Sequence, residues 1–141
     1  MTALYDPTEY SLNFAGVIPT GYGEDEFLRV EKLADNFVEV VGTDGEVSRS
    51  KVMDKRATIT FVLMKTSKTN ALLSAIAARD ENLPNGAGVG AVFIRDRQGD
   101  TVFRAAQAWI VRQPDVSLGK QAQSIEWQIR CAKLIPFIGG N

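Results

Sequence analysis

Apolar and polar residues alternate with a period of two over much of this chain, and no other feature of the sequence limits its fold as strongly. The alternation is clearest in residues 124–131, where the apolar positions are Ile125, Trp127, Ile129 and Cys131 and the polar positions are Glu126, Gln128 and Arg130. Residues 56–64 repeat it, with an apolar set of Ala57, Ile59, Phe61 and Leu63 opposite Thr58 and Thr60. Because successive side chains of a strand point to opposite faces, each segment is predicted to be a β-strand with one buried face.

Turn residues divide the remaining sequence into further short strands. These strands are predicted at 10–14, 17–19, 27–33, 36–41, 46–52, 89–95, 101–106 and 107–112. The turn at Ala34-Asp35 is interpreted as the tip of a hairpin that joins 27–33 to 36–41. The polar segment 96–100 is interpreted as the tip of another hairpin.

Residues 67–80 break this pattern and predict the one helix. The segment starts with residues that cap helices, Ser67 or Thr69, and is then rich in alanine and leucine. Its apolar stripe consists of Leu72, Leu73, Ile76 and Ala77. No linker divides the 141 residues, so we expect a single domain over 1–141. Its fold is expected to be mainly β, a two-sheet sandwich or barrel of about eight short strands with one flanking α-helix at about 67–80.

The residue inventory argues against an enzyme. The chain has no histidine and a single cysteine, Cys131, which excludes a histidine base, an intrachain disulfide and the usual zinc ligand sets. The glycine-rich run 86–90 follows the helix and precedes a strand, the reverse of the order in a phosphate-binding loop. With 16 basic and 17 acidic residues, the chain has no basic surplus for binding duplex nucleic acid. We therefore expect no catalytic residues, no metal site and no cofactor.

A protruding hairpin is predicted at about 41–55. Its turn signal is the run Thr43, Asp44, Gly45 and Glu46, in which glycine tolerates a positive φ. Three basic residues follow on the outgoing side, at Arg49, Lys51 and Lys55. They are open to two interpretations, as solvated hairpin residues or as a contact with phosphates or an acidic neighbour.

Several short segments, taken in order along the chain, resemble one protein family. They are Tyr5-Asp6-Pro7, 42–49 (GTDGEVSR), 66–74 (TSKTNALLS), 86–90 (GAGVG), 108–116 (AWIVRQPDV) and 126–131 (EWQIRC), with the closing 139–141 (GGN). The chain resembles small structural proteins of contractile-tailed phages and prophages, which we interpret as tail tube proteins. That family is related in fold to the inner tube protein of type VI secretion.

The resemblance implies a structural role in the virion tail. Subunits of such a tube form hexameric rings, and the rings stack inside a contractile sheath while double-stranded DNA passes through the lumen. The implied partners are further copies of this chain, the sheath protein and the passing DNA. No membrane partner is expected, and assembly is expected in the cytoplasm of the host bacterium. A closely related protein that initiates or ends such a tube stays open as an alternative.

Within this interpretation, two groups of residues acquire roles. The hairpin contacts the next ring through Thr43, Asp44, Gly45, Glu46, Arg49, Lys51 and Lys55. The polar strand faces line the lumen through Thr58, Thr60, Glu126, Gln128 and Arg130, with Glu126 as the expected acidic partner of Arg130. Two alternatives stay open on the residues alone. One is a monomeric β-barrel that binds a small ligand or single-stranded nucleic acid, and the other is a hydrolase that uses paired carboxylates.

Overall fold

The computed structural model describes residues 3–23 and 27–140. Within them the chain forms a 3-10 helix at Pro7–Glu9, nine strands and one α-helix. The strands are β1 (Tyr10–Phe14), β2 (Leu28–Lys32), β3 (Phe37–Val41), β4 (Val47–Lys51), β5 (Ala57–Met64), β6 (Gly90–Asp96), β7 (Val102–Ile110), β8 (Ser124–Cys131) and β9 (Ile135–Phe137), and the helix is α1 (Thr69–Asn82). The expected mainly β fold with one flanking helix is confirmed.

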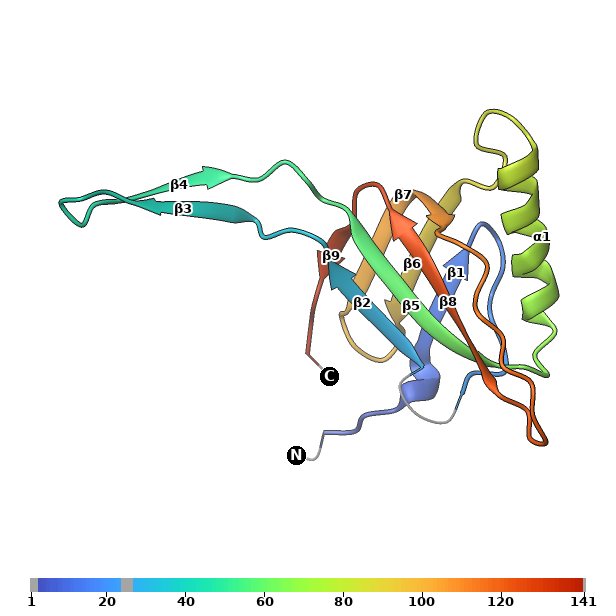
Figure 1. The fold of residues 1–141 in the computed structure, drawn as a ribbon. Coiled ribbons are helices and arrows are strands. Elements are labelled where there is room, and N and C mark those ends of the chain that lie inside the picture. Colours follow the sequence, from blue (N-terminus) through green and yellow to red (C-terminus); the bar gives the residue numbers. More distant parts are fainter. Residues whose placement is uncertain (1–2, 24–26, 141) are drawn as a thin grey trace.

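Seven of the strands form one antiparallel sheet, in the order β1-β6-β7-β8-β5-β2 with β9 added to β7. The sheet folds over, so that β2, β5 and β8 lie in front of β1, β6 and β7, with the core between the two layers (Figure 1). Strand β7 links the layers because one of its edges pairs with β6 while the other pairs first with β9 and then with β8. The separate strands expected at 101–106 and 107–112 are therefore one continuous strand.

Both alternating segments are half-buried strands, as predicted. Their apolar sets are at most 3% exposed, at Ala57, Ile59, Phe61, Leu63, Ile125, Trp127, Ile129 and Cys131. They pack against buried side chains of the other layer, at Leu12, Phe14, Val92 and Ile94. The opposite faces of both strands are more exposed, apart from Thr60, and can make contacts outside the subunit.

Helix α1 covers one side of the two layers (Figure 1), and it buries a narrower stripe than the sequence suggests. Its buried residues are Thr69, Leu73 and Ile76, with Ala77 packed beside them. Leu72 was expected in this stripe but is 55% exposed. The helix therefore meets the layers through a narrow stripe, and Leu72 lies outside it.

The first turn of α1 is tied to the core by Asn70. Its Oδ1 atom accepts a hydrogen bond of 2.9 Å from Nε1 of the buried Trp127. Its Nδ2 atom donates to the carbonyl oxygens of Met64, Lys65 and Ser67, at 3.0, 3.3 and 3.1 Å. One amide side chain therefore joins β8, the end of β5 and the start of the helix.

One predicted pairing is wrong. The segments 27–33 and 36–41 do not form a hairpin with each other, because β2 pairs with β5 and β3 pairs with β4. The chain leaves the main sheet at Leu33, whose N–H donates to the carbonyl of Arg56 at 3.2 Å, and returns at that same point. The Ala34-Asp35 signal marks this exit from the sheet rather than a hairpin tip.

Candidate assembly surfaces

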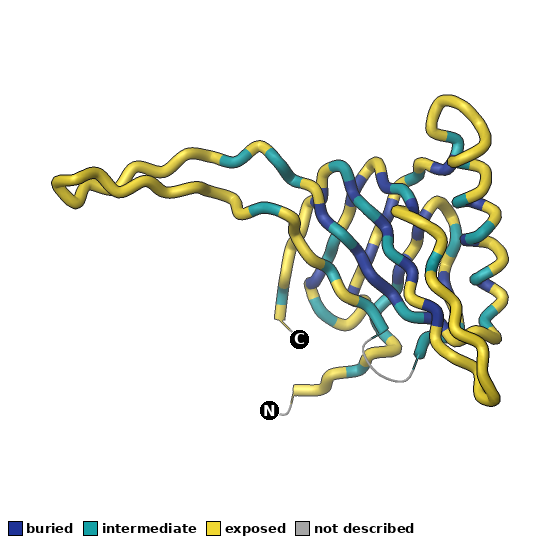
Figure 2. Tube along the Cα trace, in the orientation of Figure 1, coloured by how far each residue is buried: buried dark blue, intermediate teal, exposed yellow. Residues whose placement is uncertain are grey.

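The β3–β4 hairpin projects far from the rest of the molecule (Figure 1). Its two strands form a sheet of their own, and all ten of their residues are exposed. The hairpin is accordingly drawn in yellow in Figure 2. At its base, the N–H of Val52 donates to the carbonyl of Asn36 at 2.9 Å. A two-stranded ribbon without further packing is at best marginally stable in water, so this hairpin gains from a surface to lie against.

The hairpin tip is held by hydrogen bonds among its own residues, one between backbone groups and one to the side chain of Asp44. The N–H of Gly42 donates to the carbonyl of Glu46 at 2.7 Å, and the N–H of Glu46 donates to Oδ1 of Asp44 at 3.1 Å. Gly45 has a φ of +87°, a conformation that residues with a side chain rarely adopt. Asp44 and Gly45 therefore shape the turn, and Thr43 completes the tip.

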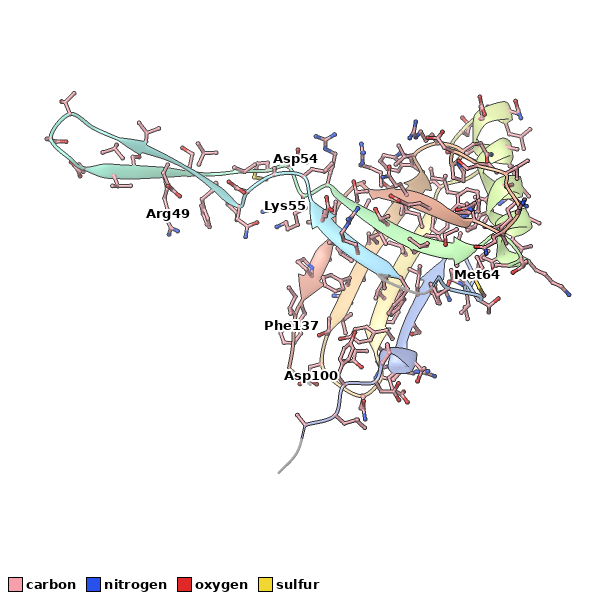
Figure 3. All side chains as sticks on the ribbon, turned by 60° about the horizontal axis from the view of Figure 1, so that its bottom comes forward. Arg49, Asp54, Lys55, Met64, Asp100 and Phe137 are labelled. Atoms are coloured by element: carbon pink, nitrogen blue, oxygen red, sulfur yellow. The ribbon has the colours of Figure 1, made fainter. Side chains whose placement is uncertain are left out.

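The basic residues proposed for ring stacking are spread along the hairpin. Arg49 and Lys51 lie on β4, whereas Lys55 lies at the base beside Asp54, where the hairpin joins the body (Figure 3). The paired strands occupy 37–51, so the range 41–55 taken from the sequence omits most of β3 and includes the base. The guanidinium of Arg49 stacks 4.4 Å from the centre of the Phe37 ring, a cation–π contact.

The hairpin is less polar than its turn suggested. The β3–β4 register places Val38, Val40, Ser48 and Ser50 on one face and Phe37, Glu39, Val41, Val47, Arg49 and Lys51 on the other. Val40 is 63% exposed and Val41 is 65% exposed, on opposite faces. Exposed apolar side chains on both faces indicate a contact surface. The apolar residues in the sequence of β3 could have indicated this contact surface.

The five candidate lumen residues lie on one face of β5 and β8. Thr58 stands opposite Arg130, and Thr60 stands opposite Gln128, with Glu126 one step further along β8. The Nε atom of Arg130 donates to Oγ1 of Thr58 at 3.3 Å. In the described part of the chain no ion pair joins Arg130 to Glu126, so the partner expected for Arg130 is replaced by a neutral hydroxyl.

Strand β2 extends this polar face. Its register puts Arg29 opposite Thr60 and Glu31 opposite Thr58, and the Nε atom of Arg29 lies 2.7 Å from a carboxylate oxygen of Glu31. Thr60 is only 6% exposed because the longer side chains of Arg29 and Gln128 flank it. We call the set Arg29, Glu31, Thr58, Thr60, Glu126, Gln128 and Arg130 the balanced face, because it carries two cations and two anions.

Cys131 is not placed as a reactive thiol, and the glycine-rich run 86–90 is not arranged as a phosphate-binding loop. Cys131 is fully buried, and burial raises the pKa of its thiol to about 11, so it stays protonated and unreactive at neutral pH. The N–H of Gly88 donates to Oδ1 of Asp80 at 3.2 Å, and a Cβ atom at Gly88 would come within 2.3 Å of Asp80 Cβ. The run is therefore a tight turn packed on the end of α1.

The described residues contain no group of three or more histidine, cysteine, aspartate or glutamate side chains placed to hold a metal ion. Across residues 3–23 and 27–140, no helix has both the length and the apolar character needed to cross a bilayer.

Sequence comparisons match this chain to known phage proteins. A family model described as the bacteriophage PhiTE tail tube protein matches residues 13–139. The structural protein ORF10 of Pseudomonas phage KPP10 is 29% identical over 122 residues, which cover 86% of this chain and 70% of that protein.

Solved structures share the fold at much lower identity. A chain of the sheath-tube complex of PVC, an extracellular contractile injection system in its extended state, superposes with a TM-score of 0.61 at 10% identity, over 94% of this chain and 90% of that one. A chain of the sheath/tube terminator of the same system gives a TM-score of 0.57 at 10% identity, over 97% and 99% of the two chains.

Proposed function

The chain belongs to the bacteriophage PhiTE tail tube protein family, and we propose that it forms hexameric rings that stack into the inner tube of a contractile phage tail. A sheath surrounds the tube, and double-stranded DNA passes through it. The role is structural and involves no catalysis. The observation that carries the proposal is the projecting β3–β4 hairpin, all of whose strand residues are exposed in the described part of the chain.

The position of the hairpin suits a contact between stacked rings. The hairpin leaves the body at the start of β5 (Figure 1). Loop 112–123 lies at the opposite end of β5, where the N–H of Lys65 donates to the carbonyl of Gln123 at 3.1 Å. A contact between unlike ends of two identical subunits can be repeated without limit, which is the geometry of an open stack.

The edges of the main sheet suit contacts within a ring. The sheet ends in β2 on one side and β1 on the other, and each of them pairs with a single strand among the described residues. Unpaired sheet edges attract further strands, and natural monomers usually protect them. We propose that strands of neighbouring subunits pair along such edges and make the wall of the tube continuous.

The balanced face suits the lumen. Each unpaired Lys or Arg that faces a phosphate adds a salt-dependent attraction, which would hold DNA back. On this face Arg29 is paired with Glu31, and the strand that carries Arg130 also carries Glu126. DNA would therefore meet a wall of mixed charge and neutral amides and hydroxyls.

We expect the double change Glu126→Lys with Gln128→Lys to leave tube assembly intact and to slow genome ejection. The new lysines would attract phosphates, and because such attraction is screened by salt, added salt should restore part of the rate. The measurement is the rate of DNA release from phage that carry the variant, at two salt concentrations. The charge-conserving swap Glu126→Gln with Gln128→Glu is the control. A failure of the lysine variant to assemble would place β8 at a subunit interface and contradict the lumen assignment.

The test of the function itself is the assembly state of the purified chain. We expect rings or tubes in negative-stain micrographs and in gel filtration at high protein concentration. A strict monomer at every concentration would argue against a tube subunit and in favour of a monomeric binding module.

A further inference from the structure

The second outer surface of the molecule differs from the balanced face. It is formed by β1, β6, β7 and β9, whose registers align side chains in two rows across four strands. The rows are Ser11, Arg95, Val102 and Phe137, and Asn13, Phe93, Arg104 and Ile135. We call these eight residues the arginine face.

Large apolar side chains are exposed on the arginine face. Phe137 is 61% exposed on β9, where Figure 3 labels it, and Phe93 and Ile135 are both at least 40% exposed. All three residues of β9 are exposed. Aromatic and aliphatic side chains gathered on one sheet surface are typical of a surface that another protein covers.

The charged residues of the arginine face are both cations, Arg95 and Arg104. Arg95 and Arg104 are exposed, and neither makes an ion pair within residues 3–23 and 27–140. Arg97, in the turn that follows β6, shows the contrast, because its Nε atom lies 3.5 Å from a carboxylate oxygen of Glu9. No aspartate or glutamate belongs to the two rows. Asp96 points inward and is 1% exposed.

We propose that the arginine face binds an acidic, partly apolar segment of the sheath protein. The proposal rests on the proposed function. The two layers of the molecule have the core between them, so their outer faces point in opposite directions (Figure 1). If the balanced face lines the lumen, the arginine face points away from the tube axis, toward whatever encloses the tube.

The chemistry of the surface specifies its partner. Guanidinium groups bind carboxylates with two parallel hydrogen bonds, and they remain charged at any physiological pH. The phenyl rings beside Arg95 and Arg104 would exclude water from such pairs, as in the centre of a protein interface. In the proposed tube, stacking contacts would use the ends of the subunit and ring contacts its sheet edges, which would leave this broad surface for a protein outside the tube.

The test compares a charge reversal on this surface with a matched reversal elsewhere. The variant is Arg95→Glu with Arg104→Glu, and the control is Lys68→Glu with Arg79→Glu, which makes the same change of net charge at exposed positions around α1. Each is produced together with a sheath protein from the same phage. Tubes are then pelleted, the sheath that pellets with them is measured, and the particles are imaged by negative stain.

We expect bare tubes from the arginine variant, with at least a tenfold loss of pelleted sheath, and sheathed tubes from the control. The conservative pair Arg95→Lys with Arg104→Lys should retain part of the binding, and raising the salt should weaken the wild-type complex. Normal sheath binding by the arginine variant would overturn the inference. So would a folded variant that forms no tubes, because the surface would then be a contact between tube subunits. An unaltered chain that forms no tubes would reject the proposed function and this inference with it.

Discussion

Replacement of residues 37–51 by a two-residue Asn-Gly turn should give a folded subunit that no longer forms tubes. No residue of β3 or β4 is buried, so the core loses nothing with them. The ends of the deleted segment already meet, since the N–H of Val52 donates to the carbonyl of Asn36 at 2.9 Å. Asn-Gly readily forms the tight turn that such a junction needs. Circular dichroism would show the retained fold, and electron microscopy would show the loss of tubes.

The deletion has to remove both strands. Deleting only Thr43–Lys51 would leave β3 without its partner and expose Val38 and Val40 further. A finer test is the double change Val38→Thr with Val40→Thr, which keeps β-branched side chains but makes the surface polar. It should shorten or abolish tubes, whereas Ser48→Thr with Ser50→Thr on the same face should be tolerated. Tubes of normal length without the hairpin would show that rings stack through another element.

Trp127→Ala should cause the largest loss of stability among single core changes. Trp127 is 1% exposed and is the largest fully buried side chain. Truncation of a buried tryptophan to alanine costs about 3–5 kcal/mol. That is much of the roughly 5–15 kcal/mol by which domains are stable. Denaturant unfolding monitored by circular dichroism would measure the loss.

Two variants separate the causes of that loss. Trp127→Phe keeps most of the buried area but leaves Oδ1 of Asn70 without its donor, which should cost about 1–3 kcal/mol. Trp109→Ala removes the same side chain from a half-buried position and should cost less than half as much as Trp127→Ala. Equal losses at both tryptophans would contradict the view that the Trp127 site anchors the core.

The sequence predicted those parts of the fold that local alternation determines. In β8 one face is apolar and the other polar, and β5 shares this pattern except at Val62 and Met64, so the buried sets could be predicted directly from the residues. The partner of β2 could not be read this way. Its pairing with β5 spans the whole projecting hairpin, and the local turn at Ala34-Asp35 favoured a nearer partner. Strand β9 has only three residues and includes Pro136, so it gave no strand signal.

The candidate assembly surfaces, like the fold, could be predicted only where a single strand determines them. Thr58, Thr60, Glu126, Gln128 and Arg130 could be assigned to common faces because they alternate within single strands. Their cross-strand neighbours, such as the hydroxyl of Thr58 beside Arg130, depend on register, which the sequence does not state locally. The arginine face draws on four strands that lie far apart along the chain, so no sequence window contains it.

The way the hairpin is attached has a mechanical consequence. Only the short segments 33–36 and 52–56 separate β3 from β2 and β4 from β5. A pull on the hairpin tip is therefore transmitted to β2 and β5, and part of it acts along their length because the hairpin is set at an angle to these strands (Figure 1). In an antiparallel sheet the hydrogen bonds run across the strands, so such a load shears many of them at once instead of opening them one after another. Because β5 is hydrogen-bonded to both β2 and β8, tension from a neighbouring subunit would be shared between two ladders of hydrogen bonds.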